Sequence, residues 1–150
     1  MKILGALILS MAPALFGAIK YLSLLERTKT LQEVYVCFYK IIDEIVFLKK
    51  ELFNILKSKN TNFFIFSSPI KINKEYFSNQ GLSSKEILIF EDFIKMLQKG
   101  DETLIKNEGE LYLKKLDTLK NEAKEELDKN GKVIITTFLS FSGMVFLVLI

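Results

Sequence analysis

Residues 133–150 of the chain read VIITTFLSFSGMVFLVLI, and residues 3–19 read ILGALILSMAPALFGAI. Neither stretch contains a charged residue, and every charged residue except Lys2 lies between residues 20 and 132. A soluble domain rarely places its most apolar runs at both termini, because the ends of a chain are the hardest parts to enclose in one core. We therefore expect a protein held in a membrane by one helix at each end, with a charged domain between them.

The length of each run fits a membrane-spanning helix. A helix rises about 1.5 Å per residue, so the two runs would span roughly 25 and 27 Å of a hydrocarbon core about 30 Å thick. The first run can extend to residue 25 if Lys20 snorkels to the headgroups, and the second can include the stem of Lys132. We expect an N-terminal transmembrane helix at residues 1–25, a cytoplasmic helical domain at 26–132 and a C-terminal transmembrane helix at 133–150.

Each apolar run has one alternative interpretation. Lys2 and the small residues 12–14 resemble the start and the cleavage site of a secretory signal peptide. The apolar run continues to Ile19, however, so cleavage would leave a hydrophobic stub, and we favour a retained anchor. The β-branched residues 133–137 could form a buried strand, but an uncharged run of this length favours a span.

The basic residues predict how the protein is oriented in the cell membrane. Six of them flank the inner ends of the two runs, namely Lys20, Arg27, Lys29, Lys124, Lys129 and Lys132. Only Lys2 lies at an outer end. Because basic residues collect on the cytoplasmic side of membrane proteins, we expect the central domain in the cytoplasm and both ends of the chain outside.

Composition excludes several classes of function. A net charge of +3 is too small to indicate a nucleic-acid partner. The single cysteine, Cys37, rules out a disulfide within the chain, which fits a reducing compartment. Histidine is absent, so the chain has no histidine-based metal site, general acid or general base.

The central segment begins with a helical pattern. From residue 31 onward, apolar residues recur at alternating spacings of three and four, which predicts a long helix with one apolar face. These positions are Leu31, Val34, Phe38, Ile41, Ile45, Leu48, Leu52 and Ile55. The face could pack in the core of a helical bundle, which we favour, or pair with another chain as a coiled coil. Cys37 lies beside it, without an adjacent residue that would activate its thiol, so we expect a packing role.

Turn residues after Ser58 end this pattern, and two further helices follow. Residues 63–66 form a short apolar plug, which could be one helical turn or a short strand. Ser83 and Glu86 have the spacing of a capping box, and Leu82 and Ile87 that of a hydrophobic staple. The predicted core face of this helix is Ile87, Phe90, Ile94 and Leu97, and Gly100 ends it.

Asp101 is placed to cap a long final helix that runs into the second span. Its candidate buried positions are Leu104, Ile105, Leu111, Tyr112, Leu116, Leu119, Ala123 and Leu127. Gly109 is a weak point within this helix. The elements together predict an all-α fold, a helical bundle flanked by two transmembrane helices.

The sequence offers no candidate catalytic, cofactor-binding or metal-binding residue and no sign of a small-molecule substrate. It has no glycine-rich phosphate loop and no nucleophile beside a plausible base. Carboxylates occur in adjacent pairs at residues 43–44, 91–92, 101–102 and 125–126. Adjacent side chains on a helix diverge by about 100°, so these pairs indicate a solvated surface rather than an acid–base dyad.

Small residues recur every third or fourth position on one face of each span. They are Ala6, Ser10, Ala14 and Ala18 in the first run and Thr136, Ser140 and Gly143 in the second. Small side chains allow membrane helices to approach closely, so we expect these faces to pack against other helices.

At this point the chain resembles the stage III sporulation protein AB family. The residues that carry the resemblance are Lys2-Ile3-Leu4-Gly5, Gly17, Glu26-Arg27, Glu44-Ile45, Phe93-Ile94-Lys95-Met96-Leu97, Asp101 and Lys129-Asn130-Gly131-Lys132. These motifs are short, and the resemblance depends on their order along the chain and on the two flanking apolar runs. The chain departs from the pattern at Phe47-Leu48 and Glu51, where the family tends to have Tyr-Gly and a later Pro, so we expect the first long helix to run on. Gln98 also replaces a glycine of the family.

The resemblance implies a role that the residues alone do not. Members of this family are membrane proteins made in the mother cell of endospore-forming bacteria, where they belong to the channel apparatus between mother cell and forespore. Their helical domain is similar to that of type II secretion F proteins, which are inner-membrane platforms that contact an assembly ATPase. The resemblance thus implies a non-catalytic docking platform, with the lipid bilayer, other channel proteins and a secretion-type ATPase as partners.

A different hypothesis needs no sporulation role. The protein could be a membrane-tethered helical adaptor or regulator whose apolar helix face binds a soluble partner. The absence of a nucleophile–base arrangement makes an enzyme the least favoured class.

Overall fold

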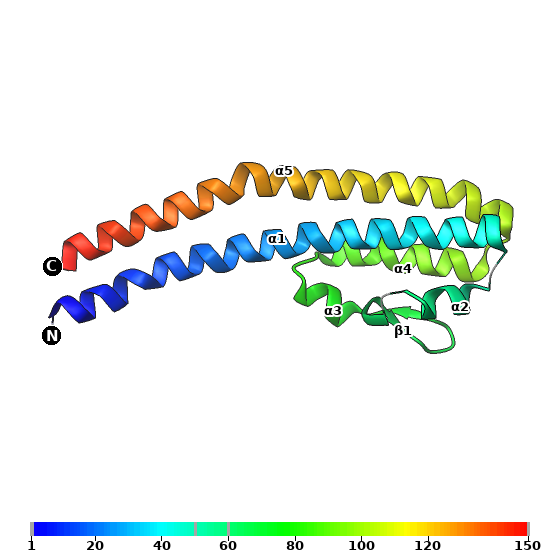
Figure 1. Cartoon of the computed structure of the whole chain (residues 1–150), viewed down its shortest axis with the longest axis horizontal. Helices are drawn as coiled ribbons and strands as arrows, with labels where there is room; N and C mark the ends of the chain where they lie inside the picture. Colours follow the sequence, from blue (N-terminus) through cyan, green and yellow to red (C-terminus); the bar gives the residue numbers. More distant parts are fainter. Residues whose placement is uncertain (1, 50, 60, 150) are drawn as a thin grey trace. The chain divides into compact units, whose positions relative to one another are not determined.

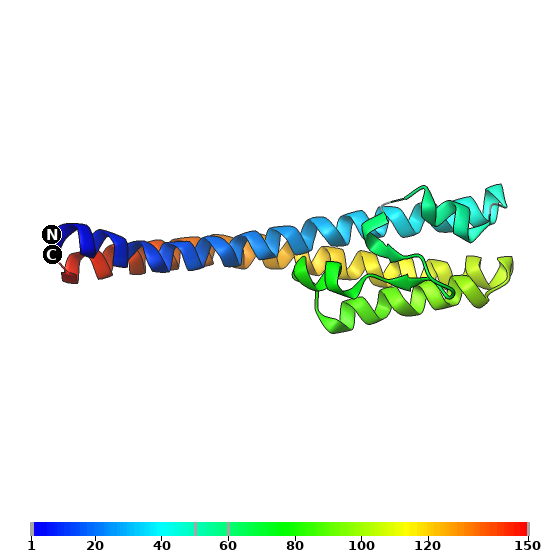
Figure 2. The same cartoon turned by 90° about the horizontal axis from the view of Figure 1, so that it is seen from below.

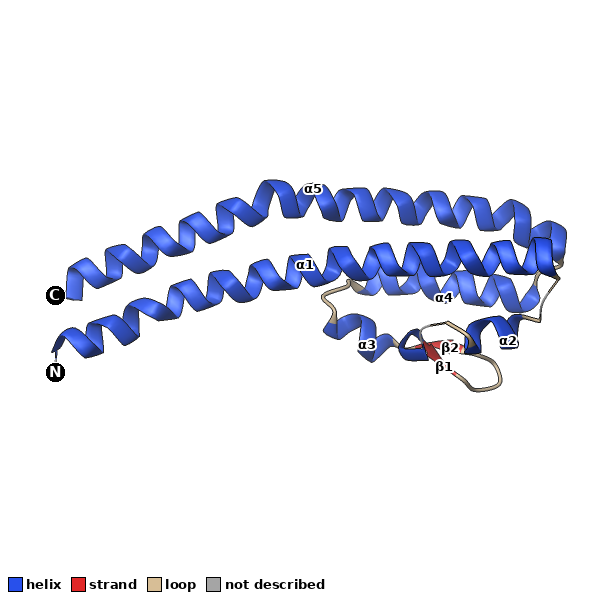
Figure 3. Cartoon of the chain, viewed as in Figure 1, coloured by secondary structure: helices blue, strands red, loops and turns tan. Residues whose placement is uncertain are grey.

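The computed structural model describes residues 2–49, 51–59 and 61–149, and its fold is all-α as predicted. Figures 1 and 3 show the order of the elements along the chain. They are α1 (Lys2–Leu48), α2 (Leu52–Lys57), the 3₁₀ turn η1 (Thr61–Phe63), β1 (Phe64–Ile65), β2 (Lys71–Ile72), α3 (Lys74–Asn79), α4 (Ser84–Lys99) and α5 (Glu102–Leu149). The second apolar run is helical throughout its described residues, so the alternative of a buried strand at 133–137 is wrong.

The described chain divides into two compact units. One consists of the residues up to 28 together with those from 122 onward, and the other of residues 29–121. We call the first unit the span pair and the second the bundle. The domain boundaries expected at residues 25 and 132 fall inside the continuous helices α1 and α5 and stay predictions.

Aromatic rings form the centre of the bundle. The Phe38 ring of α1 stacks on Phe93 of α4 with 4.0 Å between centroids, and it meets the edge of Phe90 at 5.8 Å. Phe77 of α3 contacts Phe90 at 5.1 Å and Phe63 at 5.2 Å. All five rings are almost fully buried. The predicted apolar face of α1 therefore packs inside its own chain, at Leu31, Val34, Phe38 and Ile41.

The expectation that the first long helix runs on through residue 51 is wrong. It ends at Leu48, and Lys49 follows with a φ of 50° in the left-handed region. Glu51 is then extended and precedes the short helix α2. Leu48 is consequently exposed, whereas Ile55 returns to the core. The apolar positions 48, 52 and 55 therefore do not lie on one helix face, because the first ends α1 and the other two belong to α2.

The short apolar plug adopts both of its predicted forms. Phe63 ends the turn η1, and Phe64 begins β1, which pairs antiparallel with β2. In this hairpin Phe64 lies opposite Ile72, and both are buried. Ile65 points the other way and is exposed, as the alternation of side chains along a strand requires.

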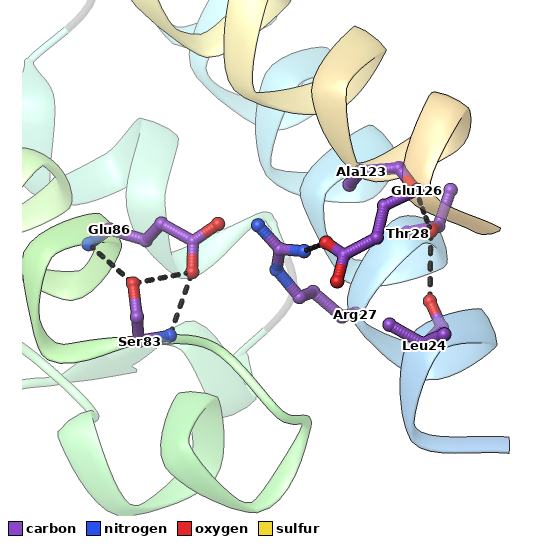
Figure 4. Close-up of polar contacts among 7 residues, drawn as sticks. All are labelled: Leu24, Arg27, Thr28, Ser83, Glu86, Ala123 and Glu126. Atoms are coloured by element: carbon purple, nitrogen blue, oxygen red, sulfur yellow. Dashed lines mark hydrogen bonds and ion pairs between the residues drawn. The ribbon is translucent and has the colours of Figure 1, made fainter. Parts of the chain in front are cut away.

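The start of α4 follows the sequence prediction closely. The Ser83 hydroxyl accepts a hydrogen bond from the Glu86 N–H, and the Glu86 carboxylate accepts one from the Ser83 N–H at 2.7 Å (Figure 4). This capping box satisfies two backbone donors at the open end of the helix. Leu82 and Ile87 beside it are buried, in line with the predicted staple. The predicted core face of α4 is confirmed, and Phe93 and Met96 extend it.

The final helix buries a narrower face than predicted. Asp101 caps it by accepting a hydrogen bond from the Leu104 N–H at 2.8 Å. Ile105, Leu116 and Ala123 are buried, but Leu104 and Leu111 are exposed, so their assignment to the core was wrong. Both are leucines beside the buried stripe, and sequence spacing alone could not separate them from it.

Gly109 has a packing role that the sequence did not reveal. A β-carbon at this position would lie 2.8 Å from the Ile42 δ-carbon of α1. The glycine therefore permits α1 and α5 to approach closely within the bundle. Glycine costs roughly 1 kcal/mol inside a helix relative to alanine, and here it avoids the overlap with Ile42 that an alanine would meet.

The aromatic centre predicts a stability difference between two phenylalanines of α1. Phe38→Ala should lower the free energy of unfolding by about 3–5 kcal/mol, because it removes a fully buried ring. Phe47→Ala is the matched control, since Phe47 lies on the same helix and is 73% exposed. Its effect should stay within about 0.5 kcal/mol. Urea unfolding of the full chain in mild detergent, followed by circular dichroism, measures both, and equal losses would contradict this core.

Candidate functional site

The two apolar ends of the chain contact each other within the span pair. Figures 1 and 2 show the first part of α1 and the last part of α5 side by side and running in opposite directions. Gly17 lies against the Phe138 ring, and a β-carbon at residue 17 would be 2.6 Å from the Phe138 β-carbon. Gly131 lies against the Tyr21 ring in the same manner, at 3.0 Å. Each helix thus offers a glycine to a ring of the other.

Two hydroxyl groups add hydrogen bonds between these helices. The Ser142 hydroxyl donates to the Ser10 carbonyl. The Thr28 hydroxyl donates to the Leu24 carbonyl at 2.8 Å and lies 3.3 Å from the Ala123 carbonyl (Figure 4). A hydroxyl that bonds to a carbonyl of its own or a neighbouring helix is satisfied without water, which an apolar surrounding requires.

The only arginine of the chain also joins the pair. The Arg27 guanidinium lies 2.6 Å from the Glu126 carboxylate, and the two side chains are 20% and 42% exposed (Figure 4). At such exposure an ion pair contributes roughly 0–1 kcal/mol. Its direction and short range make it more important for fixing the register of the two helices than for holding them together.

Most of the exposed residues in the apolar runs of the span pair are large and apolar. Both helices contain a stretch long and apolar enough to cross a membrane. More than half of the side-chain surface is exposed at Ile8, Leu9, Met11, Leu15, Phe16, Ile19, Leu22, Val133, Leu139, Phe141, Met144, Leu147 and Val148. Exposed apolar surface of this extent is unfavourable in water and is the surface that a lipid bilayer accommodates.

The predicted small-residue faces divide between contact and exposure. Ser10 is buried and Ala14 half-buried in the pair, whereas Ala18, Thr136 and Ser140 are exposed. A β-carbon at Gly143 would have no described atom within 4 Å apart from its chain neighbours and the adjoining backbone of its own helix. The side chain of Ala6 lies outside the described residues. Sequence reasoning missed Gly17, Gly131 and Phe138 as the central contacts, because glycine and phenylalanine are both common in membrane helices.

The thiol of Cys37 is buried in the bundle, in line with a packing role. Burial raises its pKa to about 11, although the nearby Lys59 and Lys40 cations act in the opposite direction. Since the thiolate is the reactive form, the thiol is protonated and unreactive at neutral pH.

The paired carboxylates point to separate partners. Glu91 lies 2.9 Å from the Lys74 ammonium, whereas Asp92 lies 3.2 Å from Lys95. At the next pair, Glu125 contacts Lys129 at 3.1 Å while Glu126 contacts Arg27. Glu44 forms an ion pair with Lys59, and Asp101 is a helix cap. Divergence of neighbours on a helix, as predicted, explains this arrangement.

Gln98 holds the hairpin segment to α4. Its side-chain amide donates to the Ile70 carbonyl at 2.9 Å and accepts from the Ile70 N–H at 3.2 Å. The amide thereby occupies the same two groups that a neighbouring β-strand would use. The sequence had marked Gln98 only as a departure from the family pattern, and a glycine there could not make this contact.

Large apolar side chains are also exposed at the end of α1 and in the segments after it. They are Phe47, Leu48, Phe53, Ile65 and Phe66. The Phe53 and Phe66 rings contact each other edge to face at 6.0 Å. Exposed aromatic residues in contact with one another are typical of protein-binding surfaces.

The family described as stage III sporulation protein AB matches residues 70–150, which is more than half of the chain. The matched range contains β2, α3, α4 and α5. It covers the later part of the resemblance found in the sequence, and the earlier part, up to residue 55, lies outside it. No curated protein and no solved structure shows significant similarity to the chain.

The glycine contacts of the span pair predict a selective effect of substitution. Gly17→Leu should separate the two helices, because its side chain would overlap the Phe138 ring. Gly143→Leu is the matched control, since its β-carbon meets open space. In a Cys37→Ser background, disulfide formation between Ser10→Cys and Ser142→Cys reports the pairing in membranes. The yield should fall several-fold for Gly17→Leu only, and an equal yield in both variants would show that the glycine contact does not hold the pair.

Proposed function

Because the chain belongs to the stage III sporulation protein AB family, we propose that it is a non-catalytic membrane component of the channel apparatus between mother cell and forespore. The family match supports a role in sporulation. The single structural observation that carries the membrane role is the span pair, in which two apolar helices contact each other and leave their outer faces uncovered. Such a pair is a two-helix anchor for the charged domain between them.

The proposed orientation places the bundle in the mother-cell cytoplasm, on the membrane that faces the forespore. The support comes from the basic residues at the inner ends of the apolar runs, as opposed to Lys2 alone at an outer end. With two spans, both ends of the chain then lie on the opposite side. The bundle is accessible in this arrangement to soluble proteins of the mother cell.

We propose that the bundle is a docking platform for an assembly ATPase, while the spans pack with other channel proteins. Two features support this. The exposed apolar side chains at the end of α1 provide a surface that protein contact would cover. The exposed small residues Thr136, Ser140 and Gly143 allow a further membrane helix to approach closely.

The chemistry of the described side chains supports a role without catalysis. The buried thiol is protonated at neutral pH, and the carboxylates engage separate cations or a helix end. An acid–base pair of carboxylates would instead be two groups that share one site with separated pKa values.

The proposed orientation can be tested with a reagent that does not cross membranes. In a Cys37→Ser background, Asn79→Cys places a thiol on an exposed residue at the end of α3. It should be protected from an impermeant maleimide in intact cells and react after permeabilisation. Lys2→Cys should react without permeabilisation. Strong labelling at residue 79 in intact cells would overturn both the orientation and the cytoplasmic platform.

The absence of catalysis can be tested on the carboxylate pairs. Ala substitutions at 43–44, 91–92 and 101–102, each made as a pair, should give graded losses of spore formation or none, because charges at the edge of a contact contribute modestly to it. The pair at 101–102 should also destabilise α5 by about 1 kcal/mol through the lost cap. Spore counts and protein levels are measured together. Complete loss from one pair in a folded, inserted protein, traced to one carboxylate by single substitutions, would indicate chemistry instead.

A further inference from the structure

A groove in the bundle lies between the segment before α3 and the helix α4. It has a volume of about 360 Å³ and is lined on one side by Ile70 and Lys71 and on the other by Ile94, Lys95 and Lys99. The volume is within the range of ordinary ligand pockets and accommodates a few side chains of another protein. We call its isoleucines, of which Ile72 and Ile94 are buried, the floor, and its exposed lysines, with Glu91, the rim.

The walls of this groove are fixed by hydrogen bonds. The Gln98 amide holds both backbone groups of Ile70, and β2 is paired with β1 at Ile65 and Lys71. The same amide lies 3.3 Å from the Ile94 carbonyl, one turn back along α4. A groove whose walls are already ordered loses little conformational entropy when it binds a partner.

The rim of the groove has uncompensated positive charge. Its one carboxylate, Glu91, contacts Lys74 outside the groove at 2.9 Å, and Lys95 contacts Asp92 at 3.2 Å. Lys71 and Lys99 are exposed and form no ion pair with the residues that the structure describes. Two free cations thus stand at opposite walls above an apolar floor.

We propose that this groove binds an acidic segment of a partner protein, with an aliphatic side chain of that segment on the floor and its carboxylates near Lys71 and Lys99. The positive charge of the rim favours a negatively charged partner, and the apolar floor favours a peptide over a bare phosphate or headgroup. The proposal deepens the docking-platform function and rests on it for the compartment in which the partner lies. It gives that platform a specific contact face and a partner chemistry.

Photo-cross-linking in sporulating cells tests the groove on the full chain. p-Benzoylphenylalanine replaces Lys95, which lies in the groove and already has an internal partner. We expect an adduct whose cross-linked peptide, read by mass spectrometry, is net negative and contains an aliphatic residue. Lys71→Glu with Lys99→Glu should reduce the adduct at least about tenfold, because like charges then face each other.

A matched double variant controls for net charge. Lys57→Glu with Lys114→Glu changes the charge equally at exposed lysines outside the groove and should leave the adduct unchanged. A neutral or basic cross-linked peptide, an adduct with lipid, equal yields in the two double variants, or no adduct from a protein that supports spore formation would each overturn the proposal. The orientation is checked in parallel by labelling at residue 79. If the orientation is as proposed but the groove gives no acidic adduct, only the groove proposal fails, whereas strong labelling in intact cells contradicts the platform function itself.

Discussion

The heptad register of α1 is the constraint on which both units depend. In the bundle, the buried residues of α1 are Leu31, Val34, Phe38 and Ile41. Counting back from Leu31 in steps of three and four gives 28, 24, 21, 17, 14 and 10, and each of these positions contacts α5 in the span pair or is at least half-buried there. The same spacing of three and four thus marks the buried face of α1 within each unit, and a shift of register would expose that face in both.

The composition of that face changes with its surroundings. Within the bundle it consists of large apolar side chains, since water drives their burial. Within the span pair it consists of Ser10, Ala14, Gly17, Tyr21, Leu24 and Thr28, while most of the large apolar residues of this part of α1 are exposed. In lipid there is no hydrophobic driving force that buries apolar side chains between helices. Close packing of small residues and hydrogen bonds therefore determine the contact. The larger share of small and polar residues on the buried face of the span pair is therefore a physical argument for a membrane around that unit.

The surfaces available for contact with other proteins are those that this packing leaves exposed. In the bundle these are the exposed aromatic residues after α1 and the cationic groove beside α4. The two surfaces differ in chemistry, and a platform can use both, since an apolar contact supplies affinity while a charged rim selects the partner and speeds association. In the span pair, the outer face has small residues as well as large ones, which allows lipid and a further helix to share it.

Sequence alone determined the elements whose signals are local. The two apolar runs, the capping box at Ser83 and the cap at Asp101 follow from hydropathy and from side chains that bond within three residues, so they could be predicted, and so could the all-α class. Only the tertiary structure showed that α1 ends at Leu48 and that Leu104 and Leu111 are exposed. The same holds for the contacts of Gly17, Gly109 and Gly131, and for the hydrogen bonds of the Gln98 amide to the backbone of Ile70. The glycine and Gln98 contacts depend on which residue of a distant segment lies opposite, and a periodic pattern does not contain that information. The groove in particular arises because residues 70 and 98, far apart in the chain, are joined by one amide group.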